Sequence, residues 1–122
     1  MCLDLDGGPN WANNMCDAPV IVNADASEFY LQPMYFHMVH FSKLLVRDSI
    51  VMKPDLKNND KSKVWPFHNK KLKLLVVRRP DDNIVVTLLN TSGDTDYTVV
   101  IQDLGMKFCV HAKSIKSVLF SL

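Results

Sequence analysis

The residues with the most evident chemical potential lie in one short stretch near the start of the chain. Between Asp6 and Pro19, two glycines and a proline are followed by Trp11, Asn13, Asn14 and Asp17. The glycines relax the backbone and the proline disfavours a helix, so we expect a shaped loop. An indole face suits the C–H face of a sugar ring, and amides can bind its hydroxyls. The alternative is that Trp11 is buried and anchors a loop whose amides bond its own backbone.

No pair of catalytic carboxyl groups is evident. Retaining glycosidases use two carboxyl groups about 5–5.5 Å apart, one as acid/base and one as nucleophile. The chain contains a single glutamate, Glu28, on an expected hairpin strand, and no motif gives it a carboxylate partner. The residues themselves therefore indicate no such pair, and we expect no turnover by the chain alone.

Histidine and cysteine spacing does not predict a metal centre. His37 and His40 are three residues apart on an expected helix and could share a face, but no third ligand is evident nearby, so core or interface histidines are expected. The wide, irregular spacing of Cys2, Cys16 and Cys109 indicates neither a zinc site nor a disulfide framework. Cys109 is expected to be a small buried hydrophobe within a strand.

One modification motif is present. Asn90, Thr91 and Ser92 form an N-glycosylation sequon directly after an expected strand, which makes Asn90 a candidate glycosylation site. Such a motif has meaning only in a secreted chain.

Composition limits the possible partners. With 122 residues and 48% hydrophobic content, the chain suits one domain or pieces of a larger one. A net charge of +1 gives no global field that favours nucleic acid or an anionic membrane. Lysines cluster between residues 57 and 73, which indicates a solvated loop and strand edge, or a contact for an acidic partner or anionic lipid. No apolar run reaches the length of a membrane span, and the first residues do not look like a signal peptide.

A single helix is expected between Gln32 and Val46. Pro33 suits its first position, and apolar residues recur at spacings of three to four, at Met34, Met38 and Phe41. Further apolar residues leave little of the helix polar, which is typical of a helix covered on most sides. We therefore expect that part of a larger protein covers it.

The other periodic segments are predicted to be strands. Two short strands around a polar turn form an expected hairpin at residues 19–31, and Val64–Phe67 is an edge strand at best. Alternating segments with turn residues between them predict an antiparallel β-sandwich, with strands at 49–53, 72–78, 84–89, 96–102, 107–111 and 114–120.

Rare residues in a fixed order produce a resemblance to a known family. Residues 7–11, Asn14, residues 17–22 and residues 29–43 resemble the C-terminal part of glucosylceramidases, the acid β-glucosidases of glycoside hydrolase family 30. The resemblance implies that Asn14 contacts the glucosyl unit and that residues 12–17 form a mobile loop at the active-site mouth. The helix would then complete a (β/α)₈ barrel. After the helix the family's usual Pro-x-Gly-Ser segment is missing.

The resemblance also implies an activity and a domain division. The parent enzyme would hydrolyse glucosylceramide to glucose and ceramide without metal or organic cofactor, with both catalytic glutamates upstream of this segment. Its partners would be lipid and a saposin-like activator, and its location lysosomal. We expect a loop and hairpin at 1–32, a barrel helix at 33–47 and a sandwich at 48–122. The alternative is a non-catalytic sandwich module that binds sugar or lipid headgroups through Trp11 and Trp65.

Overall fold

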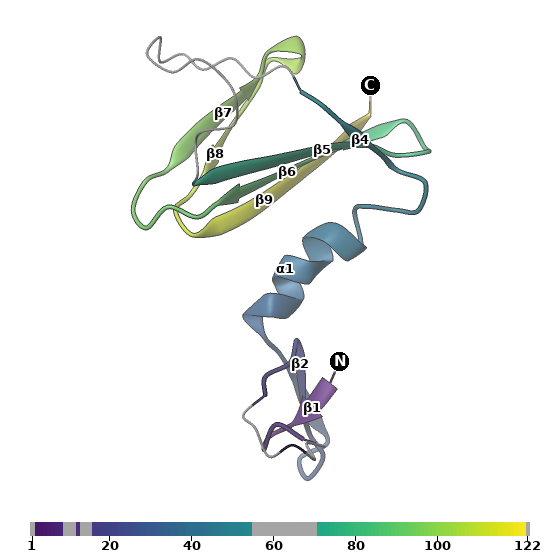
Figure 1. Cartoon of the computed structure of the whole chain (residues 1–122), viewed down its shortest axis with the longest axis vertical. Coiled ribbons are helices and arrows are strands. Elements are labelled where there is room, and N and C mark those ends of the chain that lie inside the picture. Colours follow the sequence, from purple (N-terminus) through teal and green to yellow (C-terminus); the bar gives the residue numbers. More distant parts are fainter. Residues whose placement is uncertain (1, 9–11, 13–15, 55–70, 122) are drawn as a thin grey trace. The chain divides into compact units, whose positions relative to one another are not determined.

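The structure is a computed structural model that describes residues 2–8, 12, 16–54 and 71–121. The chain divides into two compact units, Met1–Lys43 and Leu44–Leu122. Each unit has its own sheet structure, and the strands carry the labels of Figure 1. The candidate strand Val64–Phe67 lies outside the described residues.

The first unit contains a three-stranded sheet and one helix. Strand β1 (Cys2–Asp4) runs parallel to β2 (Val20–Asn23), and β2 pairs antiparallel with β3 (Glu28–Leu31). The predicted hairpin is thereby confirmed. Its turn is closed by an amide of Ser27 that donates to the Ala24 carbonyl, 3.2 Å away.

Helix α1 (Pro33–Ser42) begins as predicted but ends four residues before the predicted end at Val46. Beyond it, the amide and hydroxyl of Ser49 both donate to the carbonyl of Val46, at 3.3 and 2.6 Å. Asp48 has a φ of 64°, which no helix accommodates. The helix therefore ends at Ser42 with Lys43 as its C-cap, and Val46 lies in this later turn.

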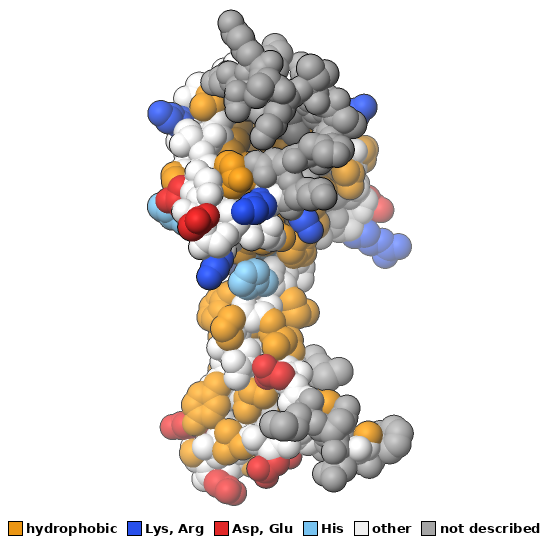
Figure 2. All heavy atoms as spheres, turned by 60° about the vertical axis from the view of Figure 1, so that its left-hand side comes forward, with side chains coloured by type: hydrophobic (Ala, Val, Ile, Leu, Met, Phe, Trp, Pro, Cys, Tyr) orange, Lys and Arg blue, Asp and Glu red, His pale blue; other side chains and the backbone are white. Residues whose placement is uncertain are grey.

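No residue of α1 is buried, although most of its side chains are apolar. Phe36 is 55% exposed and Met38 is 53% exposed, and on the neighbouring strand Phe29 is 65% exposed. Hydrophobic side chains consequently gather on the surface of this unit in Figure 2. The expectation of a helix that needs a further covering element agrees with this exposure.

The second unit contains two antiparallel sheets. One has the strand order β4-β5-β6-β9 and the other pairs β7 with β8. A 3₁₀ turn, η1, precedes Gly105, whose φ of 62° suits glycine. The mainly β fold with an antiparallel sandwich is confirmed. The bounds are β4 (Ile50–Met52), β5 (Leu72–Arg78), β6 (Asn83–Asn90), β7 (Tyr97–Ile101), η1 (Gln102–Leu104), β8 (Met106–Val110) and β9 (Ser114–Ser121).

The core of the second unit follows from the period of two along β6. Ile84, Val86 and Leu88 point to one face, where Val110 of β8 joins them in a buried cluster. Apolar residues of the flanking strands pack around this cluster, among them Leu74 and Phe108. Burial of this face joins the four-stranded sheet to the β7–β8 pair.

A buried amide closes the end of this core. Asn90 is 0% exposed, and its side-chain nitrogen donates to the carbonyls of Thr95 and Val110, at 2.8 and 3.1 Å. Its side-chain oxygen accepts from the amide and the hydroxyl of Ser92, at 2.9 and 2.6 Å. The side chain therefore links the end of β6 to the start of the β7 segment and to β8. The nitrogen that a glycan would occupy is part of this network, and glycosylation at Asn90 stays a prediction.

We predict that Asn90→Ala lowers the free energy of unfolding by at least about 2 kcal/mol, because two carbonyls and an amide lose a buried partner. Thr91→Ala is the control, since the Thr91 hydroxyl donates to the Lys71 carbonyl at an exposed position. Urea unfolding followed by circular dichroism measures both. Equal losses for the two variants would contradict the structural role of Asn90.

Candidate functional site

The predicted sugar-binding loop leaves the C-terminal end of β1 and leads to the parallel strand β2. This is the strand end at which TIM-barrel enzymes place their substrate contacts. Trp11, Asn13 and Asn14 lie outside the described residues, so the substrate contacts of Trp11 and Asn14 stay predictions. The described residues on either side of them show how the loop is held.

The entry to the loop is fixed by Asp4. One carboxylate oxygen of Asp4 accepts from the amides of Asp6 and Gly8, at 3.0 and 2.7 Å. The Asp4 amide donates to the Gly8 carbonyl at 2.8 Å, which closes a tight turn. Gly7 has a φ of 77°, and a Cβ atom there would lie 3.0 Å from the carbonyl oxygen of Cys16. The glycine predicted to shape the loop therefore does so in two ways, through its φ and through this close contact with the returning chain.

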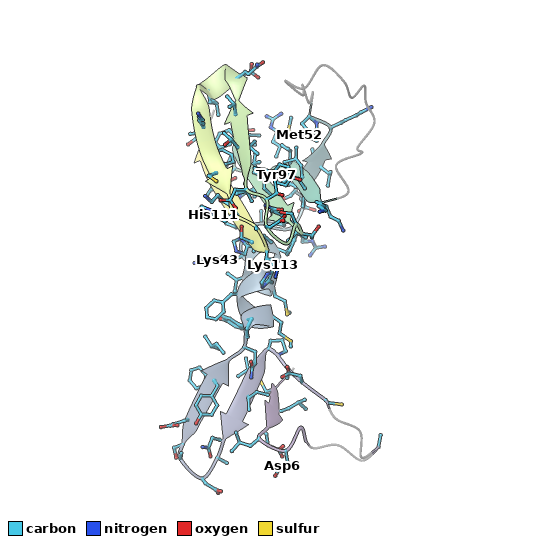
Figure 3. The ribbon with its side chains drawn as sticks, turned by 90° about the vertical axis from the view of Figure 1, so that its left-hand side faces the viewer. Asp6, Lys43, Met52, Tyr97, His111 and Lys113 are labelled. Atoms are coloured by element: carbon cyan, nitrogen blue, oxygen red, sulfur yellow. The ribbon has the colours of Figure 1, made fainter. Side chains whose placement is uncertain are left out.

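The exit from the loop is fixed in a similar manner. A carboxylate oxygen of Asp17 accepts from the amide of Ala18 at 2.7 Å, and Ala18 is fully buried. The carbonyl of Pro19 then accepts from the Gln32 amide at 2.9 Å, beside the start of α1. The Asp17 carboxylate is thus partly engaged with the backbone that leads out of the loop. Asp6, labelled in Figure 3, is exposed.

Glu28 has a local partner on its own strand. Its carboxylate accepts from the hydroxyl of Tyr30 at 2.9 Å, and the Asn23 amide lies 3.4 Å from that hydroxyl. Glu28 and Tyr30 are exposed and Asn23 is half-buried, and the three side chains span the hairpin β2–β3. The contacts support the hairpin.

One of the two helical histidines, His37, has a contact within its own helix. Nδ1 of His37 lies 2.9 Å from the Pro33 carbonyl, one turn earlier on α1, which fits a ring that donates to its own helix. In the part of the chain that the structure describes, the single group of side chains compact enough for a metal ion contains neither His37 nor His40.

That compact group consists of Asp96, Cys109 and His111 on the β7–β8 hairpin. Nδ1 of His111 lies 2.8 Å from Asp96 Oδ2, and the Cys109 sulfur lies 4.0 Å from the same oxygen. The hydrogen bond from His111, with that from the Ala112 amide, lowers the pKa of Asp96. Sequence reasoning missed this group because it treated Cys109 as a buried hydrophobe, whereas the residue is half-buried. The only sequence signal was a Cys-x-His pair on one strand.

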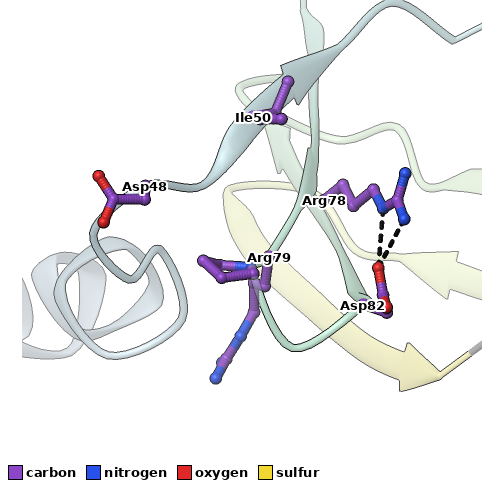
Figure 4. Close-up of a pocket in the computed structure, with 6 residues that line it drawn as sticks. Asp48, Ile50, Arg78, Arg79 and Asp82 are labelled. Carbon is purple, nitrogen blue, oxygen red and sulfur yellow. Dashed lines mark hydrogen bonds and ion pairs between the residues drawn. The ribbon is translucent and has the colours of Figure 1, made fainter.

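A pocket of about 310 Å³ lies on the second unit at the β5–β6 turn, lined by Asp48, Ile50, Arg78, Arg79, Pro80 and Asp82 (Figure 4). Arg78 donates twice to one oxygen of Asp82, at 3.2 and 2.6 Å. Arg79 forms two bonds to Asp81, at 3.1 and 2.9 Å. Each arginine therefore already has a carboxylate partner, and the pair is not an open anion site.

Two family models match the chain in succession. The TIM-barrel domain of glycosyl hydrolase family 30 matches residues 1–45, and the β-sandwich domain of the same family matches residues 68–118. The chain belongs to glycosyl hydrolase family 30. The first match nearly coincides with the first compact unit and the second lies within the second unit, so the loop after β1 belongs to the part matched by the barrel domain.

Curated relatives of the chain carry glucosylceramidase names. Lysosomal acid glucosylceramidase of Mus musculus is 34% identical over 106 residues, which cover 86% of this chain and 19% of that protein. Putative glucosylceramidase 3 of Caenorhabditis elegans is 59% identical over 49 residues, or 40% of this chain and 9% of that protein. The chain thus spans at most about a fifth of the length of these relatives.

Solved structures share the fold at low sequence identity. SrfJ from Salmonella typhimurium has a TM-score of 0.79 at 19% identity and covers 99% of this chain, which corresponds to 25% of SrfJ. The endo-β1,6-glucanase BT3312 has a TM-score of 0.72 at 17% identity, with 99% of this chain and 26% of that one covered.

We predict that Gly7→Ala loosens the loop, because alanine at a φ of 77° costs about 1–2 kcal/mol and its Cβ would press on Cys16. Amide exchange of Gly8 and Ala18 should quicken about tenfold. Gly93→Ala is the matched control, since a Cβ there has no atom within 4 Å. Unchanged amide-exchange rates of Gly8 and Ala18 in Gly7→Ala would contradict the requirement for glycine in this turn.

The turn beside the pocket gives a pH prediction. Hydrogen bonding by Asn83, with a further contribution from Arg79, lowers the pKa of Asp81 from its ordinary value of 3.8. Because the folded state favours the ionised form, the stabilisation is complete above pH 3.8 and is lost as pH falls through the lower folded pKa. A carboxyl-carbon NMR titration should place the midpoint below 3.8, and Asn83→Ala should raise it. A midpoint unchanged by Asn83→Ala would refute this cause.

Proposed function

We propose that this chain is the C-terminal part of a glucosylceramidase-like retaining β-glucosidase that hydrolyses glucosylceramide to glucose and ceramide. The observation that carries the proposal is the 34% identity to the mouse enzyme over 106 residues, across both units. The two successive family matches support the same assignment.

The chemistry of the chain supports a contributing role and not a complete active site. It contains one glutamate, and that residue is bound to Tyr30 at the hairpin. A double displacement needs a second carboxyl group at about 5–5.5 Å. The catalytic glutamates are therefore proposed to lie on other barrel strands, outside this chain.

The exposed apolar surface of the first unit is consistent with that role. Phe29, Phe36 and Met38 are each more than half exposed, and few of the residues that the structure describes in this unit are buried. In a barrel enzyme such side chains would pack against the remaining strands and helices. The chain then provides a loop at the barrel mouth and a helix at its outer layer.

Asn14 and Trp11 are the proposed substrate contacts. Asn14 would hydrogen-bond a glucosyl hydroxyl, and Trp11 would lie against the sugar ring. The turns at Asp4 to Gly8 and at Asp17 to Ala18 would fix both ends of the loop while its middle reaches the substrate.

Because this substrate is a lipid, the proposal extends to the cellular location and the partners of the protein. We assign a lysosomal location by the name of the mouse relative, and a saposin-like activator and anionic lipid as partners that present glucosylceramide. No helix among the described residues is long and apolar enough to cross a membrane.

A chimera tests the proposal directly. In it, this chain replaces the matching stretch of the mouse lysosomal enzyme, and hydrolysis of glucosylceramide and of a fluorogenic β-glucoside is measured. We expect turnover by the chimera and none by the isolated chain. Asn14→Ala in the chimera should lower kcat/KM about tenfold to a hundredfold, because a substrate hydrogen bond is lost.

The control is Gln102→Ala, which removes an exposed amide from η1 in the sandwich and should leave kcat/KM unchanged. A folded chimera without activity, or hydrolysis by the isolated chain, would disprove the proposal. An Asn14→Ala chimera with full activity would disprove the substrate contact alone.

A further inference from the structure

We propose that Asp96, Cys109 and His111 form a site for a single zinc-like divalent cation on the β7–β8 hairpin. The inference does not depend on the proposed glycosidase function. It rests on three side chains that the strand pairing brings together although they are up to 15 residues apart in sequence.

The register of the hairpin places all three on one face. Tyr97 pairs with Val110, and Thr98 pairs with Cys109. Asp96 and His111 are the next residues outward and therefore face each other. Cys109 and His111 are two residues apart, so their side chains point to the same side of the strand. His111 follows β8 directly and is labelled in Figure 3.

The three ligand atoms already have nearly the spacing that a tetrahedral ion requires. Zinc binds sulfur at about 2.3 Å, histidine nitrogen at about 2.0–2.1 Å and carboxylate oxygen at about 2.0–2.2 Å, so neighbouring ligand atoms lie about 3.4–3.6 Å apart. Here Nδ1 of His111 is 2.8 Å from Asp96 Oδ2 and 3.9 Å from the Cys109 sulfur. Sulfur and oxygen are 4.0 Å apart. Side-chain rotations that move these three ligand atoms by about half an ångström would produce the coordinating geometry.

The surroundings fix the ligands without enclosing them. The second oxygen of Asp96 accepts from the Ala112 amide at 2.8 Å, which orients the carboxylate and leaves Oδ2 for the ion. Lys116 donates to the Cys109 carbonyl and ties β8 to β9. The side chains of His111 and Asp96 are 70% and 51% exposed, so an ion can enter and a water molecule can take the fourth position.

The donor set selects the class of metal. Thiolate and imidazole suit zinc and the neighbouring transition metals, whereas calcium and magnesium require mostly oxygen ligands. The simpler reading is an ion pair between His111 and Asp96 with a nearby thiol that takes no part. The two readings differ in whether sulfur bonds to the metal.

Cobalt titration of the full 122-residue chain distinguishes them. Cys2→Ser and Cys16→Ser are introduced first, so that Cys109 is the sole thiol. The site should bind one Co²⁺ with a thiolate-to-cobalt charge-transfer band, and equimolar Zn²⁺ should abolish that band. Zn²⁺ should also raise the Tm of the chain.

Cys109→Ser should remove the charge-transfer band, and Asp96→Asn and His111→Gln should each weaken binding at least tenfold. His37→Gln, in the helix, is the matched control and should change nothing. Because Asp96 and His111 are exposed, their variants keep the test valid if Cys109→Ser misfolds. Absence of the band in the parent chain, or equal affinity in the parent and His111→Gln, would overturn the proposal.

Discussion

The fold of the second unit depends on the burial of one face of β6. This strand pairs with β5 on one side and β9 on the other, and its alternate residues Ile84, Val86 and Leu88 meet Val110 across the core. A shift of one residue in either pairing would turn these side chains to the opposite face. The hydrophobic effect therefore selects the register. The register in turn places Asn90 beside the segment that leads into β7 and beside the last residue of β8.

The two units satisfy their apolar residues in different ways. In the second unit the strands provide each other with a covered face, and a cluster of buried aliphatic side chains results. In the first unit the helix has no buried residue, and among the residues that the structure describes there, only Leu3 and Ala18 are buried apolar side chains. Such exposure of apolar side chains is unusual on the surface of a monomeric domain and is typical of a surface that packs against another part of a protein. Membership in a family with a barrel domain accounts for this difference.

Much of the architecture could be predicted from the sequence, because local rules determine it. Alternating apolar residues predicted β5, β6 and β9 to within about one residue, and Pro33 predicted the start of α1. The predicted end of α1 at Val46 was wrong, because the apolar residues continue beyond Ser42 although the helix does not, and Val46 belongs to a turn with Ser49. The Asp96–Cys109–His111 group could not be predicted either. It depends on which residues face each other across a hairpin, and that register follows from long-range packing. The residues expected to bind sugar lie mostly outside the described part of the chain.

The buried sequon has a consequence for the order of events during synthesis. Attachment of an oligosaccharide requires an accessible Asn90 nitrogen, whereas the completed sandwich encloses that atom between two carbonyl oxygens. Ser92, the other residue that the transferase reads, is also fully buried. In a secretory compartment the transferase and the closing sandwich would compete for the same side chain. A chain that closed its sandwich first would remain without sugar, and one modified first would have to fold around a bulky substituent at the end of its central strand.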